Sequence, residues 1–353
     1  MTQAGEAVTD RSGPRIETLA CPRSSFQQPQ MGITGFGSGA VAKKLEHYPG
    51  YPKYLMKIDA LGNVVVPPRM VLGRILAGGG PLGTGSAISS NGGLLNLWVA
   101  GLPQGAYVQS LYSVVIRKDT LKVVSRHKTP VSVVNTDHFG VTNNPSNNFL
   151  AVQVLEPPFQ NVVVRNVGYA LSESGAVLPG VSWFFSSPPT SFSSMNVSSA
   201  GKVLLFENPI QGHRARWVML QPLGANGRPV GSPVTIAKGQ YIDALDISNT
   251  LPGNRRFVLY RVLFGVHGGA FHHALFLQVV DAKTLQNIGG RITVAYNVGD
   301  PYQQAAIDPV GQFVLYGELL RFQALDATGH PSGLPKSILP DQPAAGGIDI
   351  LKD

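Results

Sequence analysis

The chain has 353 residues, of which only 14% are charged, and it contains 41 glycines and 27 prolines. This composition supplies many turns and few of the Glu–Lys pairs that stabilise helices, so it favours an all-β chain. No apolar run approaches the roughly 18 to 20 residues of a membrane helix, and the single cysteine, Cys21, excludes an internal disulfide and a multi-cysteine metal site. The formal charge of +8 favours anionic partners without naming one.

The chain opens with a polar segment, residues 1–25, in which Gly, Pro, Ser and charged residues follow no period. We expect a flexible tail there. Its first 15 residues lack the apolar core of a signal peptide. Residues 26–353 show no compositional break, so we expect them to form a single domain.

Strand–turn–strand units recur along that domain, from Tyr54–Val64 to Ala306–Ile338. One such unit cannot bury its own faces, whereas several packed side by side can. The second turn of each unit is marked by Gly62, Leu121, Gly175, Gly227, Leu285 and Gly329. These positions are roughly 45 to 60 residues apart, which is the size of a propeller blade. The sequence therefore predicts a β-propeller of six blades, each with four antiparallel strands, and leaves five or seven blades as the alternatives.

The two ends of the domain complement each other. The segment Gly347–Leu351 (GIDIL) is similar to Tyr241–Leu245 (YIDAL), which leads the fifth unit into its innermost strand. The first unit has outer strands and lacks a clear inner one. We expect strands from both ends to close the ring, because closure removes an exposed sheet edge.

One segment carries a resemblance to a known family. Residues Asp308–Tyr316 (DPVGQFVLY) resemble the S-P-D-G-x-x-hydrophobic-Tyr core of the bacterial TolB-like, PD40-type propeller repeats, and Val197–Phe206 resembles a variant of it. Asp and Pro are transposed in the last unit, and the second to fifth units lack the Pro-Asp pair. The resemblance implies a six-bladed propeller, a fold that serves binding, scaffolding and several enzymatic chemistries.

The connections between the second and third strands of the units are long, and they share one end of the predicted ring with the connections between units. These long segments are Ala100–Gln109, Glu156–Asn166, Glu207–Arg216 and Gly265–His273. The turns of the opposite end are short and rich in Gly and Asn. Long, irregular loops are where ligand sites concentrate. The candidate ligand-binding residues are His138, Arg214, Arg216, Tyr241, His267, His272 and Tyr302.

These candidates leave two functions open. Arg214 and Arg216 suit a carboxylate or a phosphate, and His267 and His272 flank a hairpin tip without the spacing of metal ligands. We therefore expect no metal and no cofactor. The leading prediction is a non-catalytic binding or scaffold propeller that recognises a partner protein, a glycan or a small ligand. The alternative is a hydrolase or lyase with a His/Asp/Arg set at the mouth of the central channel.

A basic run lies in the second unit, and only Asp119 opposes it. Nucleic acid or an acidic glycan could dock on it, although no aromatic residues for base stacking are interleaved, so nucleic acid is not favoured. Cations on an outer strand also deter edge-to-edge pairing, and that role is the favoured one. The run consists of Arg117, Lys118, Lys122, Arg126, His127 and Lys128.

Abundant Ser, Asn and Gly slightly favour a periplasmic or secreted protein, and we expect a monomer.

Overall fold

The structure is a computed structural model. It describes residues 15–20, 53–59, 61–72, 86–91, 94–101, 109–133, 140–144, 147–156, 163–172, 176–185, 195–198, 200–209, 215–267, 270–296, 305–317, 320–338 and 349–350.

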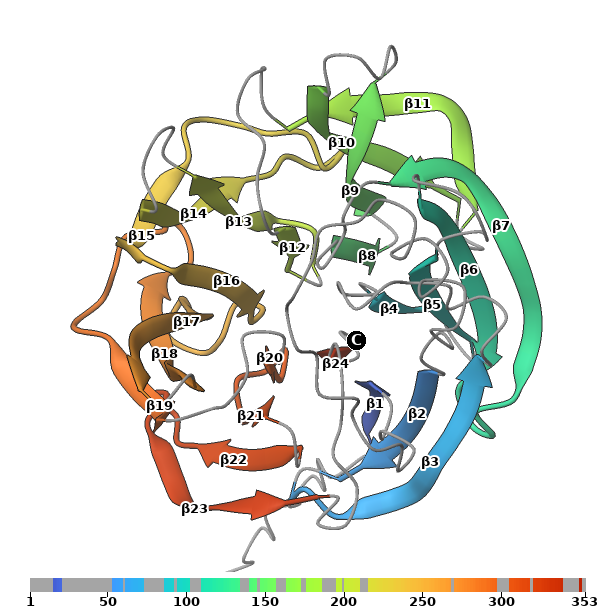
Figure 1. Cartoon of the computed structure of the whole chain (residues 1–353). Helices are drawn as coiled ribbons and strands as arrows, with labels where there is room; N and C mark the ends of the chain where they lie inside the picture. Colours follow the sequence, from blue (N-terminus) through green and yellow to red (C-terminus); the bar gives the residue numbers. More distant parts are fainter. Residues whose placement is uncertain are drawn as a thin grey trace, which may run out of the picture.

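The described strands pair into six antiparallel sheets of four strands, arranged around a centre (Figure 1). We number the sheets around the ring and give the strands of each from the centre outward. Sheet 1 contains β24 (Asp349–Ile350), β1 (Arg15–Ala20), β2 (Lys53–Ile58) and β3 (Val64–Leu72). Sheet 2 contains β4 (Ser86–Asn91), β5 (Leu94–Gly101), β6 (Gln109–Arg117) and β7 (Val123–Val133). Sheet 3 contains β8 (Gly140–Asn144), β9 (Asn147–Glu156), β10 (Val163–Leu171) and β11 (Val177–Phe184).

The second half of the ring repeats this order. Sheet 4 contains β12 (Met195–Val197), β13 (Val203–Pro209), β14 (Ala215–Pro222) and β15 (Val234–Gln240). Sheet 5 contains β16 (Ile242–Ile247), β17 (Arg255–His267), β18 (Ala270–Asp281) and β19 (Ile292–Tyr296). Sheet 6 contains β20 (Ala305–Ile307), β21 (Phe313–Tyr316), β22 (Arg321–Leu325) and β23 (Pro331–Ser337).

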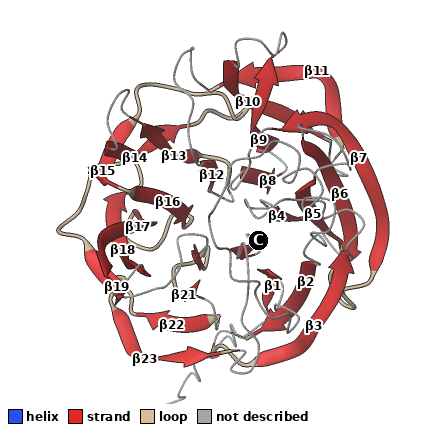
Figure 2. Ribbon diagram, viewed as in Figure 1, coloured by secondary structure: helices blue, strands red, loops and turns tan. Residues whose placement is uncertain are grey.

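Every regular element within these described ranges is a strand (Figure 2). The predicted all-β propeller fold is therefore confirmed. The described part of the chain has no helix of the length and hydropathy that would cross a membrane.

Sheet 1 joins the two ends of the described chain. Strand β1 pairs with β2 on one side, and on the other it pairs with β24, where Glu17 faces Ile350 and Thr18 faces Asp349. The expectation of a flexible tail over residues 1–25 is wrong for Arg15–Ala20, because these residues form the second strand of sheet 1. The rest of that segment, with Cys21, lies outside the described residues.

The core consists of apolar layers between neighbouring sheets. One cluster joins Leu205 and Val218 of sheet 4 to Ile242 and Val258 of sheet 5, and a second joins sheet 5 to sheet 6. Further clusters lie between sheets 6 and 1, 2 and 3, and 3 and 4. At these five boundaries the sheets bury apolar faces against their neighbours, as the repeat pattern requires.

The turns between the third and fourth strands explain the marker residues of the repeat. Five of the six markers have positive φ: Gly62 (74°), Leu121 (54°), Gly227 (72°), Leu285 (59°) and Gly329 (91°). The sixth, Gly175, lies outside the described residues. In four of these turns an aspartate accepts hydrogen bonds from nearby backbone N–H groups and side chains. Those bonds hold the pKa of each carboxyl below its ordinary value of 3.8. The four are Asp59, Asp119, Asp281 and Asp326.

Sheets 4 to 6 share a second structural feature, a buried glutamine on the third strand. This residue is Gln221, Gln278 or Gln323. Its side-chain Nε2 donates to the carbonyl of the next residue and to carbonyls ten or eleven residues further on, which belong to the start of the fourth strand or the turn before it. The buried amide thus ties the third strand to the segment that leads into the fourth strand.

Candidate functional site

The ring has two unlike ends. We call the end that bears the connections between second and third strands, and between sheets, the loop face, and the opposite end the turn face. The turn face carries the short turns at 59–63, 223–233 and 326–330. On the loop face, a group of four charged side chains lies where sheets 4 and 5 meet. We call it the ionic network, and it consists of Glu207, Arg216, Asp243 and Arg261.

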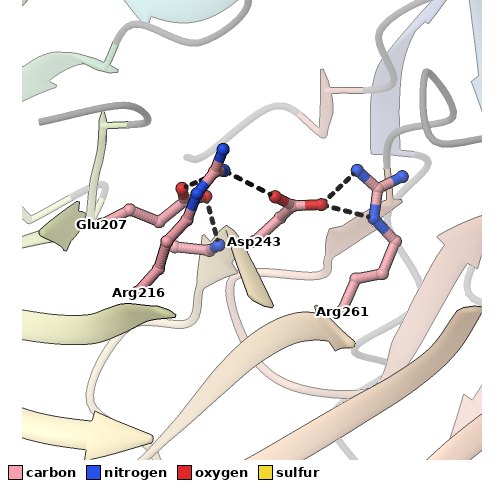
Figure 3. Close-up of polar contacts among 5 residues, drawn as sticks. Glu207, Arg216, Asp243 and Arg261 are labelled. Carbon is pink, nitrogen blue, oxygen red and sulfur yellow. Dashed lines mark hydrogen bonds and ion pairs between the residues drawn. The ribbon is translucent and has the colours of Figure 1, made fainter. Parts of the chain in front are cut away.

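The ionic network alternates in charge from one side chain to the next (Figure 3). Arg216 Nη1 donates to Glu207 Oε2 at 3.0 Å and to Asp243 Oδ1 at 3.1 Å. Arg261 donates to Asp243 Oδ2 through Nε at 2.9 Å and through Nη2 at 2.5 Å. The two carboxylates and two guanidinium groups cancel in formal charge, so the network can lie partly buried without leaving an unpaired ion.

Strand register assembles this group. Glu207 faces Val218 across β13 and β14, so Arg216, two residues before Val218, is its diagonal neighbour on the same side of sheet 4. Asp243 faces Arg261 directly across β16 and β17. Because β16 is the innermost strand of sheet 5, Asp243 can meet Arg216 of sheet 4 as well as Arg261 of its own sheet.

Burial differs sharply within the network. The Glu207 side chain is 2% exposed, and its second oxygen, Oε1, accepts the backbone N–H of Ala244 on β16 at 2.8 Å. Arg261 is 8% exposed, whereas Arg216 is 38% exposed. Glu207 therefore ties sheet 4 to sheet 5, and Arg216 is the member that solvent or a ligand can reach.

Arg216 keeps part of its hydrogen-bonding capacity. Both of its recorded bonds use Nη1, and in Figure 3 its other terminal nitrogen carries no dashed line. A guanidinium has five N–H donors in a planar fork, which matches a carboxylate or a phosphate. The ionic network thus presents a fixed guanidinium at the loop face.

Tyr241 links the strands that hold this guanidinium. It is the single residue between β15, whose Gly239 pairs with Arg216, and β16, which carries Asp243. Its φ of 52° is positive, a conformation that costs energy for a bulky residue. The carbonyl of Tyr241 accepts the N–H of Leu263 at 3.0 Å, which holds the connection against β17, and its side chain is partly exposed.

Two more aromatic side chains are exposed on sheet 5. A β-bulge between Leu263 and Gly265 turns Phe264 outward. Its ring meets that of Tyr296 edge to face, with ring centroids 6.4 Å apart. On sheet 4, Lys238 Nζ lies 4.8 Å from the Trp217 ring centroid. Apolar ring surface therefore accompanies the charged groups on this side of the ring.

The structure places some of the candidate residues and not others. Arg216 and Tyr241 lie at the site as described. His267 and His272 lie on β17 and β18, where His267 pairs with Ala270 and His272 with Gly265 across the hairpin. His138, Arg214 and Tyr302 lie outside the described residues. Among the described residues, no group of three or more His, Cys, Asp or Glu could hold a metal ion.

Sequence reasoning missed three of the four network residues. Glu207, Asp243 and Arg261 are isolated charges on separate strands, and only register and sheet order bring them together. A weak signal was present, because Asp243 lies in the segment Tyr241–Leu245 that marks an innermost strand. A charge that interrupts an otherwise apolar strand near its end is a candidate for a buried ion pair.

Comparison with known proteins supports the fold and leaves the activity open. No protein-family model matches the chain, and no curated protein matches it in sequence. A chain of the nidogen/laminin complex superposes with a TM-score of 0.51 at 7% identity, covering 96% of this chain and 98% of that one. The GH43 endo-arabinanase from Bacillus licheniformis superposes at 0.42 with 13% identity, over 72% and 99% of the two chains. The Dos1 propeller superposes at 0.38 with 11% identity, over 73% and 74%. The superposition on the chain of the nidogen/laminin complex, with its TM-score above 0.5, supports the β-propeller fold.

Proposed function

We propose that this protein is a non-catalytic binding propeller that captures a carboxylate-bearing partner protein, glycan or small ligand on its loop face. Arg216 is the central recognition residue. Tyr241 supplies aromatic surface beside it, and we assign the loop-face candidates His138, Arg214, His267, His272 and Tyr302 to the surrounding contact area.

The observation that carries this proposal is the way in which Arg216 is held. Two carboxylates fix one terminal nitrogen, while the side chain remains 38% exposed. Fixing an arginine beforehand reduces the side-chain entropy that binding would otherwise cost. Its remaining donors can then form charge-assisted hydrogen bonds, which contribute about 1.5 to 3 kcal/mol each.

Asp243 supports binding in this proposal. Its oxygens accept from two guanidinium groups, so its role is to position Arg216 and Arg261. The alternative function, a hydrolase or lyase, would require a titratable group at the loop face that contacts the reacting atoms. Assignment to the TolB-like, PD40-type repeats is part of the same proposal and rests on Asp308–Tyr316.

Titration with simple carboxylates tests the proposal. Glucuronate and N-acetyl-aspartate are titrated into the protein with glucose as the neutral control, and the Arg Nε–Hε resonances are followed by NMR. We expect one arginine resonance to shift when either carboxylate is added. The same resonance should stay in place when glucose or salt alone is added. In Arg216→Lys the apparent affinity should fall about tenfold, which corresponds to 1.4 kcal/mol. The turn-face variant Arg228→Ala, which removes an exposed cation elsewhere, should bind as the wild type does.

Binding that is equally strong in Arg216→Lys would overturn the role of this residue. Consumption of an ester or glycoside that carries the same carboxylate, abolished by His267→Ala with the fold intact, would instead establish the enzymatic alternative.

A further inference from the structure

A second group of charged side chains, nearly all of them cations, lies on the outer side of the ring, on other sheets than the ionic network. It spans the outer strands of sheets 1 and 2, and its members are exposed or partly exposed. We call it the basic wall, and it consists of Arg69, Arg117, Lys118, Lys122, Arg126, His127 and Lys128.

Two sheets contribute to the basic wall. Arg69 on β3 donates from Nη1 to the carbonyl of Thr120 at 3.0 Å, which brings it beside the β6–β7 turn. In return, Arg126 on β7 donates from Nη2 to the carbonyl of Val71 at 3.3 Å. Figure 1 shows β3 and β7 following one another along the outer rim. The run of cations in sheet 2 therefore continues onto sheet 1, a continuity that the sequence does not reveal because 48 or more residues separate Arg69 from the run.

Acidic residues scarcely offset this charge. The carbonyl partners of Arg69 and Arg126 fix their geometry without neutralising them. Asp119 is the one acidic residue in the sequence run, and its carboxylate accepts the N–H and hydroxyl of Thr120. Six Lys and Arg against this aspartate give a formal charge of +5, out of +8 for the whole chain. Such a local excess attracts polyanions, because binding releases their condensed counterions.

Edge protection alone does not account for the basic wall. Cations that deter pairing belong on the outermost strands, and Arg69 on β3 and Arg126, His127 and Lys128 on β7 fit that role. Arg117, however, ends β6, the third strand, and Lys118 and Lys122 lie between β6 and β7. The cations extend from Lys122, just before β7, to Lys128 on β7, about 20 Å at 3.3 Å per residue. A row of this kind matches a linear chain of regularly spaced anions.

The composition of the surface selects among such chains. Val124 is the one large hydrophobic side chain that strands β6 and β7 expose among the described residues, and it is not aromatic. Single-stranded nucleic acid binds through aromatic stacking as well as charge, and this surface offers it cations without exposed aromatic rings. A sulfated polysaccharide carries more charge per unit length than one that is only carboxylated, so it releases more counterions when cations bind it. We propose that the basic wall binds a linear sulfated polysaccharide.

This second site is independent of the loop-face site. Its residues lie on sheets 1 and 2, and the ionic network lies on sheets 4 and 5. A small carboxylate at Arg216 and a sulfated chain on the basic wall can therefore be bound together, and each can fail without the other.

Heparin is the probe for this proposal. We compare the wild type with Arg117→Gln/Lys122→Gln/Lys128→Gln, three positions for which no hydrogen bond to another described side chain is recorded. The matched control is Lys202→Gln/Arg228→Gln/Lys283→Gln, three exposed cations of sheets 4 and 5. Both triples lower the formal charge from +8 to +5. Dissociation constants are measured as a function of NaCl concentration, and thermal unfolding verifies that each variant is folded.

We expect the basic-wall triple to bind heparin at least about tenfold more weakly at low salt. The slope of log K against log salt should fall by about two to three, because roughly one released ion is lost for each contact removed. The control triple should retain the wild-type slope. An equal loss of heparin affinity in both triples would show that binding depends only on the net charge of the protein, and it would overturn the proposal. Tighter binding of single-stranded DNA of equal charge, competing with heparin and lost in the basic-wall triple, would overturn the polysaccharide assignment. Titration with glucuronate reports the loop-face site separately and should be unchanged in both triples.

Discussion

Gly227 and Gly231 lie in the same connection of sheet 4. They distinguish two reasons for a glycine, which are a positive φ and a lack of space for a Cβ atom. Both have positive φ, 72° and 64°. A Cβ added to Gly227 would lie 2.5 Å from the Phe149 ring of sheet 3, whereas a Cβ on Gly231 would meet nothing within 4 Å. The first glycine is thus required by backbone conformation and by packing between sheets, the second by conformation alone.

Replacing each by alanine should expose this difference. Gly231→Ala should lower the free energy of unfolding by about 1 kcal/mol, the cost of a left-handed alanine. Gly227→Ala adds the cost of displacing a buried aromatic ring, about 1 to 3 kcal/mol, so its total should be roughly 2 to 4 kcal/mol. Urea unfolding of the two variants measures the difference. Equal losses would mean that Phe149 moves aside freely and that the turn does not hold sheet 3 in place.

At the scale of the element, Glu207 shows how one side chain joins two sheets. It lies on β13, but it accepts the backbone N–H of Ala244 on β16 and the guanidinium of Arg216 on β14. The Glu207 side chain is 2% exposed, and its loss leaves the buried Ala244 N–H without this acceptor and Arg216 with Asp243 as its remaining carboxylate.

Glu207→Ala should therefore destabilise the fold by about 2 to 4 kcal/mol, because a buried N–H loses its acceptor and the partly exposed Arg216 loses one of its two carboxylates. Glu207→Gln keeps a side-chain oxygen for Ala244 and should cost about 1 to 3 kcal/mol. Chemical denaturation gives both values, and amide exchange at Ala244 should accelerate in the alanine variant alone. An unchanged exchange rate there would show that water or another group replaces the carboxylate.

The repeat and its turns could be predicted from the sequence, whereas the contacts between distant strands could not. Turn chemistry is local, so the markers from Gly62 to Gly329 could be read from residue type, and five have the positive φ that such turns require. Strand β1 could not be found, because its six residues are separated from β2 by more than 30 residues without a strand pattern. The ionic network was missed for a related reason: Glu207 and Asp243 meet only through the order of the sheets.

At the scale of the whole molecule, stability depends on a series of similar contacts between neighbouring sheets. Apolar clusters join sheets 2 to 6 in series and sheet 6 to sheet 1. Sheet 1 is built from segments near both ends of the sequence, with β24 and β1 as its inner strands. Contacts between the first and last sheets are also apolar, since Met56 and Ile58 of β2 pack with Phe313 and Leu315 of β21. An open chain of sheets would instead end in two uncovered faces.

Removal of residues 345–353 tests whether β24 closes this ring. The truncation deletes the inner strand of sheet 1 and leaves the edge of β1 without its partners at Glu17 and Thr18. We expect a lower and less cooperative thermal transition, together with aggregation, because a bare strand edge pairs with other molecules. A shorter truncation, residues 351–353, spares β24 and serves as the control. Static light scattering during heating measures both effects. If the two truncated proteins unfold at the wild-type temperature and stay monomeric, β24 contributes nothing to closure, and the apolar contact between sheets 6 and 1 must hold the ring by itself.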